Sequence, residues 1–297
     1  MFFVFEWICI LVGAHQLLKL ACYLHNIVFT LISKQNFAVY GQGVWALVTG
    51  ATDGIGKACA RELARNGFNI ILVSRNAQKL RDTAGEIQSE FGVKTQVVEA
   101  DFGKCAVNPI HFFTTLHNQV RDKDIGILVN NVGTGESGFF KDISFDDILR
   151  MNALNLWPIV MLTRLIAPSM LKRAQKGLIV NLGSIASVIV LPASAVYCGG
   201  KSFDLHLSNI MALDLHLAEK NNAGIDVLCL KPGYVNTPLT KNIKKKQLEI
   251  SAEECARYGL KAAGSVVYTN GHWKHILMEI VIRLFRPLVQ RVEQDPR

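Results

Sequence analysis

Paired cysteines are missing from this 297-residue chain. Its seven cysteines are scattered, odd in number and never spaced as Cys-x-x-Cys. That distribution argues against a disulfide framework and against a zinc site, so we expect no metal. No Asn-x-Ser/Thr glycosylation sequon occurs either. Both absences indicate that the catalytic part faces a reducing compartment.

Motifs for nucleic-acid recognition are also absent, although the formal net charge is +8. No aromatic platform accompanies the basic residues, so we expect no nucleic-acid partner. Part of the charge is concentrated in Lys241, Lys244, Lys245 and Lys246. Such a run can meet anionic lipid head groups or an anionic substrate, or it can be ordinary solvated surface.

Charge is scarce in residues 1–33, where Glu6 and Lys19 are the only charged side chains. The mean hydropathy of +0.24 is high for a soluble enzyme. A spanning helix needs about 20 mainly apolar residues, and a signal peptide would need a basic start that this segment lacks. We therefore expect a retained membrane anchor that spans the bilayer or lies in its interface. An amphipathic helix packed on the domain's own surface is the alternative.

Short β-branched runs alternate with helix-period segments after a polar joint at residues 34–43. This alternation predicts a single α/β domain over residues 44–270, built on a doubly wound parallel sheet of the Rossmann type. The expected strands are Trp45–Thr49, Asn69–Val73, Thr95–Ala100, Ile125–Val129, Leu178–Leu182 and Ile225–Leu230. The expected helices include Gly56–Asn66, Ala77–Phe91, Asn155–Arg173 and Tyr197–Lys220. Residues 271–297 are expected to form an amphipathic closing helix or tail.

A glycine-rich turn follows the first expected strand and opens a helix. Glycines allow a tight turn and a close approach to a pyrophosphate, whose charge is met by the amides at the helix start. A tight turn without a ligand is the alternative, but the position between strand and helix favours a dinucleotide. The residues expected to hold it are Gly50, Thr52, Asp53, Gly54, Ile55 and Gly56.

The end of the second expected strand predicts which dinucleotide binds. An enzyme that prefers NAD usually has an acid there, and this chain has Ser74 and Arg75 instead. The serine can donate a hydrogen bond, and the arginine can pair with a 2′-phosphate in a charge-assisted contact worth roughly 1.5–3 kcal/mol. We therefore expect NADP(H). The alternative for Arg75 is an exposed loop arginine.

Further cofactor contacts are expected where later strands end. Asp101 follows the third strand and can hydrogen-bond near the adenine. Asn131 and Gly133 follow the fourth strand and form a turn along which the ribose would pass. The sixth strand leads into a rigid turn that can hold the nicotinamide carboxamide, with Pro232, Val235 and Thr237.

Tyr197 and Lys201 are four residues apart at the start of an expected helix, so they share a face. A free phenol has a pKa of about 10, and a nearby ammonium lowers it by stabilising the phenolate. Tyr197 is therefore the expected general acid/base and Lys201 the residue that tunes it, both beside the cofactor. A core tyrosine beside a surface lysine is the alternative.

Two more polar residues complete the expected catalytic group. Ser184 follows the fifth strand and can hydrogen-bond a substrate carbonyl at the same end of the sheet. An asparagine on the preceding helix can hold a water in the proton path to the lysine. Asn152 and Asn155 are both candidates, and Asn155 is preferred because it leads into the long apolar run.

These residues together resemble the short-chain dehydrogenase/reductase family over roughly residues 44–267. Four segments look like its 17β-hydroxysteroid dehydrogenase and very-long-chain 3-oxoacyl-CoA reductase branch: residues 40–41, 45–58, 73–76 and 126–133. The resemblance implies an endoplasmic-reticulum membrane enzyme with its catalytic domain in the cytosol. It also implies that NADPH reduces a lipid-like substrate, either a 3-oxoacyl-CoA or a steroid ketone.

The chain departs from the family's pattern in its tyrosine motif and in its serine segment. Gly199 and Gly200 stand where the family commonly has alanine and serine or threonine, and glycine in a helix costs roughly 1 kcal/mol relative to alanine. Gly183 replaces a second serine before Ser184. Neither change removes a reacting group, so we expect activity. An NADPH-binding scaffold or regulatory protein is the alternative, and self-association into a homo-oligomer is left open.

Overall fold

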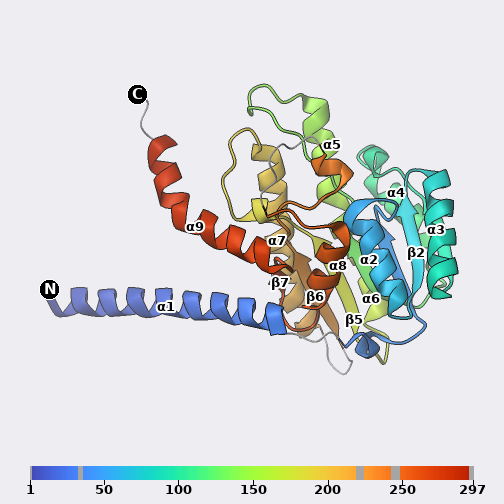
Figure 1. The fold of residues 1–297 in the computed structure, drawn as a ribbon, viewed down its shortest axis with the longest axis horizontal. Coiled ribbons are helices and arrows are strands. Elements are labelled where there is room, and N and C mark those ends of the chain that lie inside the picture. The colour runs from blue at the N-terminus through green and yellow to red at the C-terminus, as the bar shows by residue number, and fades with distance from the viewer. Residues whose placement is uncertain (1, 33–35, 219–223, 242–247, 294–297) are drawn as a thin grey trace.

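The computed structural model describes residues 2–32, 36–218, 224–241 and 248–293 (Figure 1). Within these residues, seven parallel strands form one sheet in the order β3-β2-β1-β4-β5-β6-β7. The strand order reverses between β1 and β4, as in a doubly wound fold. The strands are β1 Trp45–Thr49, β2 Asn69–Ser74, β3 Thr95–Glu99, β4 Ile125–Asn130, β5 Gly177–Leu182, β6 Ile225–Leu230 and β7 Tyr268–Thr269.

Most of the helices connect these strands, and one α-helix precedes the first strand and one follows the last strand along the chain. The α-helices are α1 Phe2–Ile32, α2 Gly54–Arg65, α3 Ala77–Phe91, α4 Pro109–Asn118, α5 Phe145–Asn155, α6 Trp157–Met170, α7 Ala195–Leu217, α8 Ala252–Leu260 and α9 Trp273–Glu293. The short 3₁₀ helices are η1 Phe37–Tyr40, η2 Phe102–Lys104, η3 Ile185–Ser187 and η4 Pro238–Thr240.

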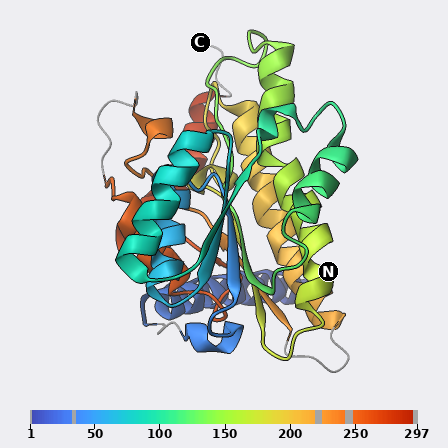
Figure 2. The same ribbon diagram turned by 90° about the vertical axis from the view of Figure 1, so that its right-hand side faces the viewer.

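Both faces of the sheet are covered by helices, as Figure 2 shows. Successive side chains of a strand point to opposite faces. Ala46 and Val48 of β1 pack in a cluster with α2, α3 and α8, whereas Leu47 packs in a second cluster with α4, α6 and α7. Because both faces are buried, the strands are almost continuously apolar, which is why their positions could be predicted.

The predicted fold class is confirmed, with two corrections to its elements. The helix expected over Asn155–Arg173 does not begin at Asn155, which is the last residue of α5. Pro158 lacks an amide hydrogen and sits in the first turn of a new helix, α6. Strand β7 was not predicted, because two residues carry no periodic signal. The end predicted at Lys220 lies outside the described residues.

Helix α1 projects away from the sheet (Figure 1). Its segment Phe5–Ile32 is long and apolar enough to cross a membrane. An apolar stretch of 18 residues within this segment has none of its residues buried. Near its C-terminal end the helix meets the domain, where Thr30 Oγ1 lies 2.9 Å from Thr269 Oγ1. A second apolar stretch, Phe145–Met170, covers α5 and α6 and is half buried, as expected for core helices.

Glu279 of α9 ties the last helix to the sheet. Its fully buried carboxylate accepts hydrogen bonds from Lys231 Nζ at 2.6 Å, Asn270 Nδ2 at 2.8 Å and Arg283 Nε at 2.8 Å. Burial alone would raise the pKa of Glu279, but Lys231 and Arg283 outweigh it and hold that pKa below its usual range. Because Lys231 immediately follows β6, this network fixes the start of the Pro232 turn.

Replacing Gly199 by alanine should stabilise the protein. A Cβ at this position in α7 would meet no atom within 4 Å, so the substitution removes backbone entropy from the unfolded chain without a clash. We expect the free energy of unfolding to rise by about 0.5–1 kcal/mol, measured by urea denaturation.

Gly56→Ala is the matched control, because its Cβ would overlap Gly50 O and Asn131 Nδ2. This variant should be destabilised by about 1–3 kcal/mol. A Gly199→Ala protein less stable than the wild type would contradict the first expectation.

Candidate active site

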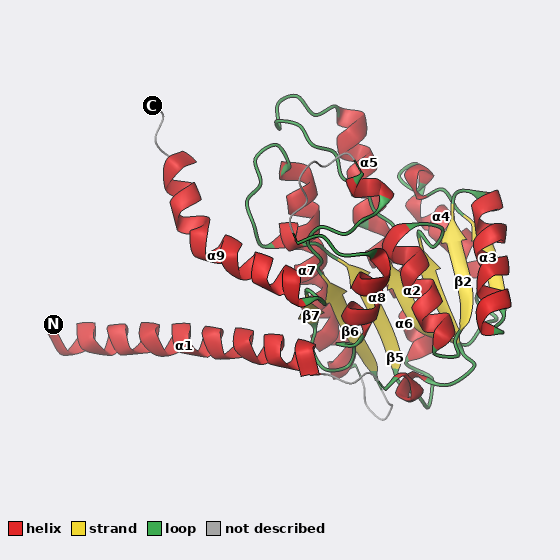
Figure 3. Ribbon diagram, in the orientation of Figure 1, coloured by secondary structure: helices red, strands yellow, loops and turns green. Residues whose placement is uncertain are grey.

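A cavity of about 810 Å³ opens at the carboxyl ends of the central strands. Figure 3 shows the loops after these strands gathered at the same edge of the sheet. Among the residues predicted for the site, Gly56 and Asn155 do not line this cavity. The predicted residues that do line it are Gly50, Thr52, Asp53, Gly54, Ile55, Ser74, Arg75, Asp101, Asn131, Gly133, Ser184, Tyr197, Lys201, Pro232, Val235 and Thr237.

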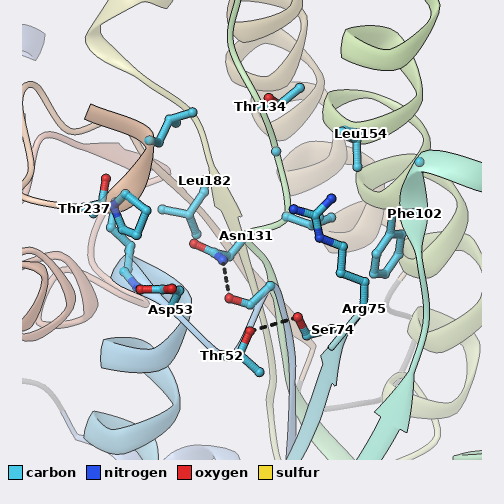
Figure 4. A pocket seen from close by; sticks show the side chains of 18 of the residues that line it. Thr52, Asp53, Ser74, Arg75, Phe102, Asn131, Thr134, Leu154, Leu182 and Thr237 are labelled. Carbon is cyan, nitrogen blue, oxygen red and sulfur yellow. Dashed lines mark hydrogen bonds between the residues drawn. The ribbon is translucent and has the colours of Figure 1, made fainter. Parts of the chain in front are cut away.

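Asn131 holds the glycine-rich turn against the end of β4. Its Nδ2 donates to Thr49 O at 2.9 Å. It also donates to Gly50 O at 3.3 Å (Figure 4). A Cβ on Gly50 would lie 2.7 Å from that nitrogen, and a Cβ on Gly56 would overlap it. These two glycines are therefore required by the packing of the turn itself. Gly56 supports the cavity from behind.

Helix α2 starts at the cavity wall. Asp53 caps it by accepting from Gly54 N at 3.1 Å and also pairs with Lys79 Nζ at 3.1 Å. Amides in the first turn of a helix have no intrahelical partner, and the helix dipole adds positive potential there. The start of α2, with Gly54 and Ile55 in the cavity wall, therefore suits an anionic group.

The end of β2 carries an unopposed positive charge. Ser74 Oγ lies 2.9 Å from Thr52 Oγ1, which links the end of β2 to the glycine-rich turn. Arg75 is exposed and lies in the cavity wall near Phe102 in Figure 4. Within the described part of the chain no carboxylate lies within ion-pair distance of Arg75, although several other basic residues are paired. Its guanidinium is therefore available to an anion.

Tyr197 and Lys201 lie one turn apart on α7 at the other end of the cavity. Lys201 is 6% exposed, and its Nζ donates to Leu182 O at 2.7 Å and to Asp204 Oδ2 at 3.0 Å. Burial alone would lower the pKa of Lys201, but the charge and hydrogen bond of Asp204, with a smaller contribution from Tyr197, raise that pKa above its usual range. The amine is therefore an ammonium at neutral pH.

Asn155 supports the wall beside this ammonium. It is buried, its Oδ1 accepts from Thr134 N at 2.9 Å, and its Nδ2 donates to Thr134 O at 2.9 Å. A Cβ on Gly133 would lie 2.8 Å from Asn155 Oδ1 and 3.8 Å from Lys201 Nζ. Asn155 is thus close to the lysine, but both of its side-chain groups are bonded to Thr134. Its predicted hold on a water stays a prediction.

The remaining predicted residues belong to rigid turns. Ser184 Oγ accepts from Ala186 N at 3.1 Å, and Asp101 Oδ1 accepts from Gly103 N at 3.1 Å. Pro232 O accepts from Ile185 N at 2.9 Å, which joins the turns after β5 and β6. Lys241 is exposed, and the lysines at 244, 245 and 246 lie outside the described residues.

Sequence reasoning missed several residues that shape the cavity. Leu182 precedes Ser184 at the end of β5, and Arg150 pairs with Glu136 at 2.7 Å and Asp147 at 3.0 Å. No local pattern separates such residues from ordinary core or surface positions. The unpredicted lining includes Asn76, Lys79, Phe102, Lys104, Thr134, Arg150, Leu154, Leu182 and Leu239.

Comparison with known families decides what this arrangement belongs to. The family model described as short chain dehydrogenase matches residues 44–248. The chain belongs to the short-chain dehydrogenase family. Members of this family are oxidoreductases that act on CH–OH and C=O groups, so the predicted enzyme class is confirmed.

Relatives within the short-chain dehydrogenase family confirm the predicted branch. A very-long-chain 3-oxoacyl-CoA reductase of Anas platyrhynchos is 38% identical over 242 residues, covering 80% of this chain and 74% of the relative. The human protein named inactive hydroxysteroid dehydrogenase-like protein 1 is 35% identical over 239 residues, covering 78% and 69%. A short-chain dehydrogenase from Sphingobium yanoikuyae in complex with NADPH matches with a TM-score of 0.65 at 27% identity, covering 73% and 83%.

Proposed function

We propose that this short-chain dehydrogenase uses NADPH to reduce a ketone on a lipid-like substrate, such as a 3-oxoacyl-CoA or a steroid. One observation supports this most strongly. Tyr197, Lys201 and Ser184 lie together in one cavity, whose opposite end is formed by the glycine-rich turn and Arg75. The cavity therefore offers a cofactor site and a reaction site in continuous space.

Each reacting residue has a defined task in this proposal. When bound, NADPH supplies the hydride that reaches the carbonyl carbon. Ser184 donates a hydrogen bond to the carbonyl oxygen, and Tyr197 transfers its proton to that oxygen. The Lys201 ammonium stabilises the phenolate that remains on Tyr197. Asn155 supports the path by which the proton is replaced.

The choice of NADPH over NADH depends on the end of β2. Arg75 would pair with the 2′-phosphate, and Ser74 would hydrogen-bond to it. A related structure at 27% identity contains NADPH, which supports the same cofactor here. At the other end of the cofactor, the turn at Pro232, Val235 and Thr237 would hold the nicotinamide carboxamide.

A lipid-like substrate is supported by apolar side chains near the reaction site. Two loops continue from the cavity residues Thr134 and Ser184, and Gly138 N donates to Ala193 O at 2.8 Å between them. These loops and the segment after β6 expose large apolar side chains that an apolar substrate could cover: Phe139, Phe140, Val190, Leu191 and Leu239.

We also propose how the chain is organised around this site. Residues 1–33 would anchor it to a membrane, residues 34–43 would join the anchor to the catalytic domain at 44–270, and residues 271–297 would close it. The unburied apolar surface of α1 supports the anchor, and by resemblance the membrane is that of the endoplasmic reticulum. Exposed Phe203, Ile210 and Leu213 on α7 support self-association with a second copy.

The alternative is an NADPH-binding scaffold with little turnover. One relative at 35% identity has a name that describes it as inactive. The presence of Ser184, Tyr197 and Lys201 in one cavity favours the enzyme. A scaffold would have no need of a tyrosine beside a buried ammonium.

Tyr197→Phe should remove turnover and leave cofactor binding intact. The substitution deletes the proton donor and keeps the ring, so kcat should fall by about 10²–10⁴-fold. The Kd for NADPH, measured by fluorescence titration, should stay within about twofold of the wild type, because charge-assisted contacts elsewhere dominate it. Turnover retained in the phenylalanine variant would mean that another group supplies the proton.

Arg75→Ser should weaken NADPH binding about tenfold or more and leave NADH binding almost unchanged, because only NADPH has a 2′-phosphate. Isothermal titration of both cofactors checks this. Arg81→Ser removes the same charge from an exposed position of α3 outside the cavity wall, so it serves as the control. Equal losses for NADPH and NADH would contradict the assignment of Arg75.

Glutamine at positions 244, 245 and 246 should distinguish the two substrate classes. If the lysine run meets the phosphates of an acyl-CoA, KM for that substrate should be several-fold higher in the variant than in the wild type. Because salt screens the attraction, this difference in KM should become smaller as salt is added. KM for an uncharged steroid ketone on the same variant should hardly change, which provides the control. Unchanged acyl-CoA kinetics would remove the reason for giving the run a role.

A further inference from the structure

Asp204 is a fully buried carboxylate directly behind the proposed reaction site. It lies on α7 one turn after Lys201, and its Oδ2 accepts from Lys201 Nζ at 3.0 Å. Its Oδ1 has no hydrogen-bond partner among the described residues. A buried carboxylate is costly unless it is paired, so the contact with Lys201 is its main compensation.

Few other ionisable groups face Lys201. On α7 these are Tyr197 and Asp204, and from the adjacent strand β6 the thiol of Cys229 faces both members of the pair. Burial raises the pKa of Cys229 to about 11, so the thiol is uncharged at neutral pH. Lys231 faces Cys229 from the end of β6, and its own charge is met by Glu279. Among the described residues, Asp204 is therefore the carboxylate that balances Lys201.

We propose that Asp204 is a positioning residue for the proposed reaction, which holds Lys201 in its charged form and fixes its ammonium against Leu182 O. A lysine this deeply buried favours the neutral amine unless an anion accompanies it. A neutral amine would stabilise the Tyr197 phenolate far less than an ammonium does. The effect of Asp204 on catalysis thus passes through Lys201, and in that respect the inference rests on the proposed function.

The geometry supports both parts of this role. An ammonium has three N–H donors, and two of them are taken by Leu182 O at 2.7 Å and Asp204 Oδ2 at 3.0 Å. The two acceptors come from different elements, β5 and α7, so together they define the position of Nζ. One donor is left for groups in the cavity.

Another reading of the same contact predicts the opposite sign. If Asp204 only cancelled the field of a lysine that stays charged without it, removing the carboxylate would strengthen the attraction between Lys201 and the phenolate. Alcohol oxidation requires the Tyr197 phenolate as base. Its kcat/KM therefore falls at low pH, where the phenolate is protonated, and the position of this acid limb of the pH profile distinguishes the two readings. Loss of the ammonium moves that limb to higher pH, whereas loss of cancellation moves it to lower pH.

Asp204→Asn provides the test, because the amide keeps an acceptor for Lys201 and removes the charge. In kcat/KM for alcohol oxidation with NADP⁺, we expect the acid limb to move to higher pH by about one unit or more. Ser208→Ala is the matched control, since Ser208 is also buried on α7 and bonds to Asp204 O at 2.6 Å without carrying charge. Its limb should not move. A limb that stays in place or moves to lower pH in Asp204→Asn overturns the proposal.

A second measurement does not depend on turnover. Carbon-13 NMR of the full-length protein labelled at the lysine Cε follows the titration of each lysine, and Lys201→Arg assigns the signal. We expect Lys201 in the wild type to keep its charge beyond the pH at which an ordinary lysine loses it, and to titrate at least about one unit lower in Asp204→Asn.

The NMR experiment also separates the two levels of inference. If no substrate is turned over but Lys201 titrates as expected, the proposed function fails, whereas the part of the inference by which Asp204 keeps Lys201 charged stands. If Asp204→Asn does not fold, the wild-type titration still decides, because a Lys201 that loses its proton near neutral pH overturns the proposal.

Discussion

The site depends on one buried cation. The Lys201 ammonium lies between the carbonyl of Leu182 and the carboxylate of Asp204, one helical turn from Tyr197. Its position requires the end of β5, the start of α7 and the wall that Asn155 holds through Thr134. Any element that moved would either expose the ammonium to water or leave it without an acceptor, and Tyr197 would then lose its charged neighbour.

The rest of the fold places the proposed dinucleotide site beside that cation. Parallel strands end at one edge of the sheet, and the glycine-rich turn after β1 is locked to β4 by Asn131. Near the β6–β7 edge of the sheet, Glu279 binds Lys231 and so connects α9 to the turn that starts at Pro232. Helix α1 reaches the domain at β7, through Thr30 and Thr269, so it is attached on this same side.

Much of this arrangement could be predicted from the sequence, because local signals carried it. Strands buried on both faces are continuous apolar runs, and Tyr197 and Lys201 share a helix face by spacing alone. The cavity brings together the glycine-rich turn, Ser74, Arg75 and Ser184 as expected, while their roles remain proposals. In these cases the relevant residues are close in sequence or occupy equivalent strand ends.

What could not be predicted depends on contacts between distant segments or on burial. Asp204 follows Lys201 by one turn, but the sequence does not reveal that this face of α7 is closed to solvent. Glu279 and Lys231 are 48 residues apart, and no pattern pairs them. Pro158 could be read in the sequence, but the helix break beside it was not predicted. Asn155 therefore ends α5, whereas it was expected to begin the following helix.

The most direct test of the account is NADPH oxidation by the purified full-length protein with a panel of 3-oxoacyl-CoAs and steroid ketones. The account predicts that NADPH is consumed and that the matching secondary alcohol appears in equal amount for at least one class. A protein that binds NADPH tightly, keeps Lys201 charged and consumes none with any member of the panel would contradict it.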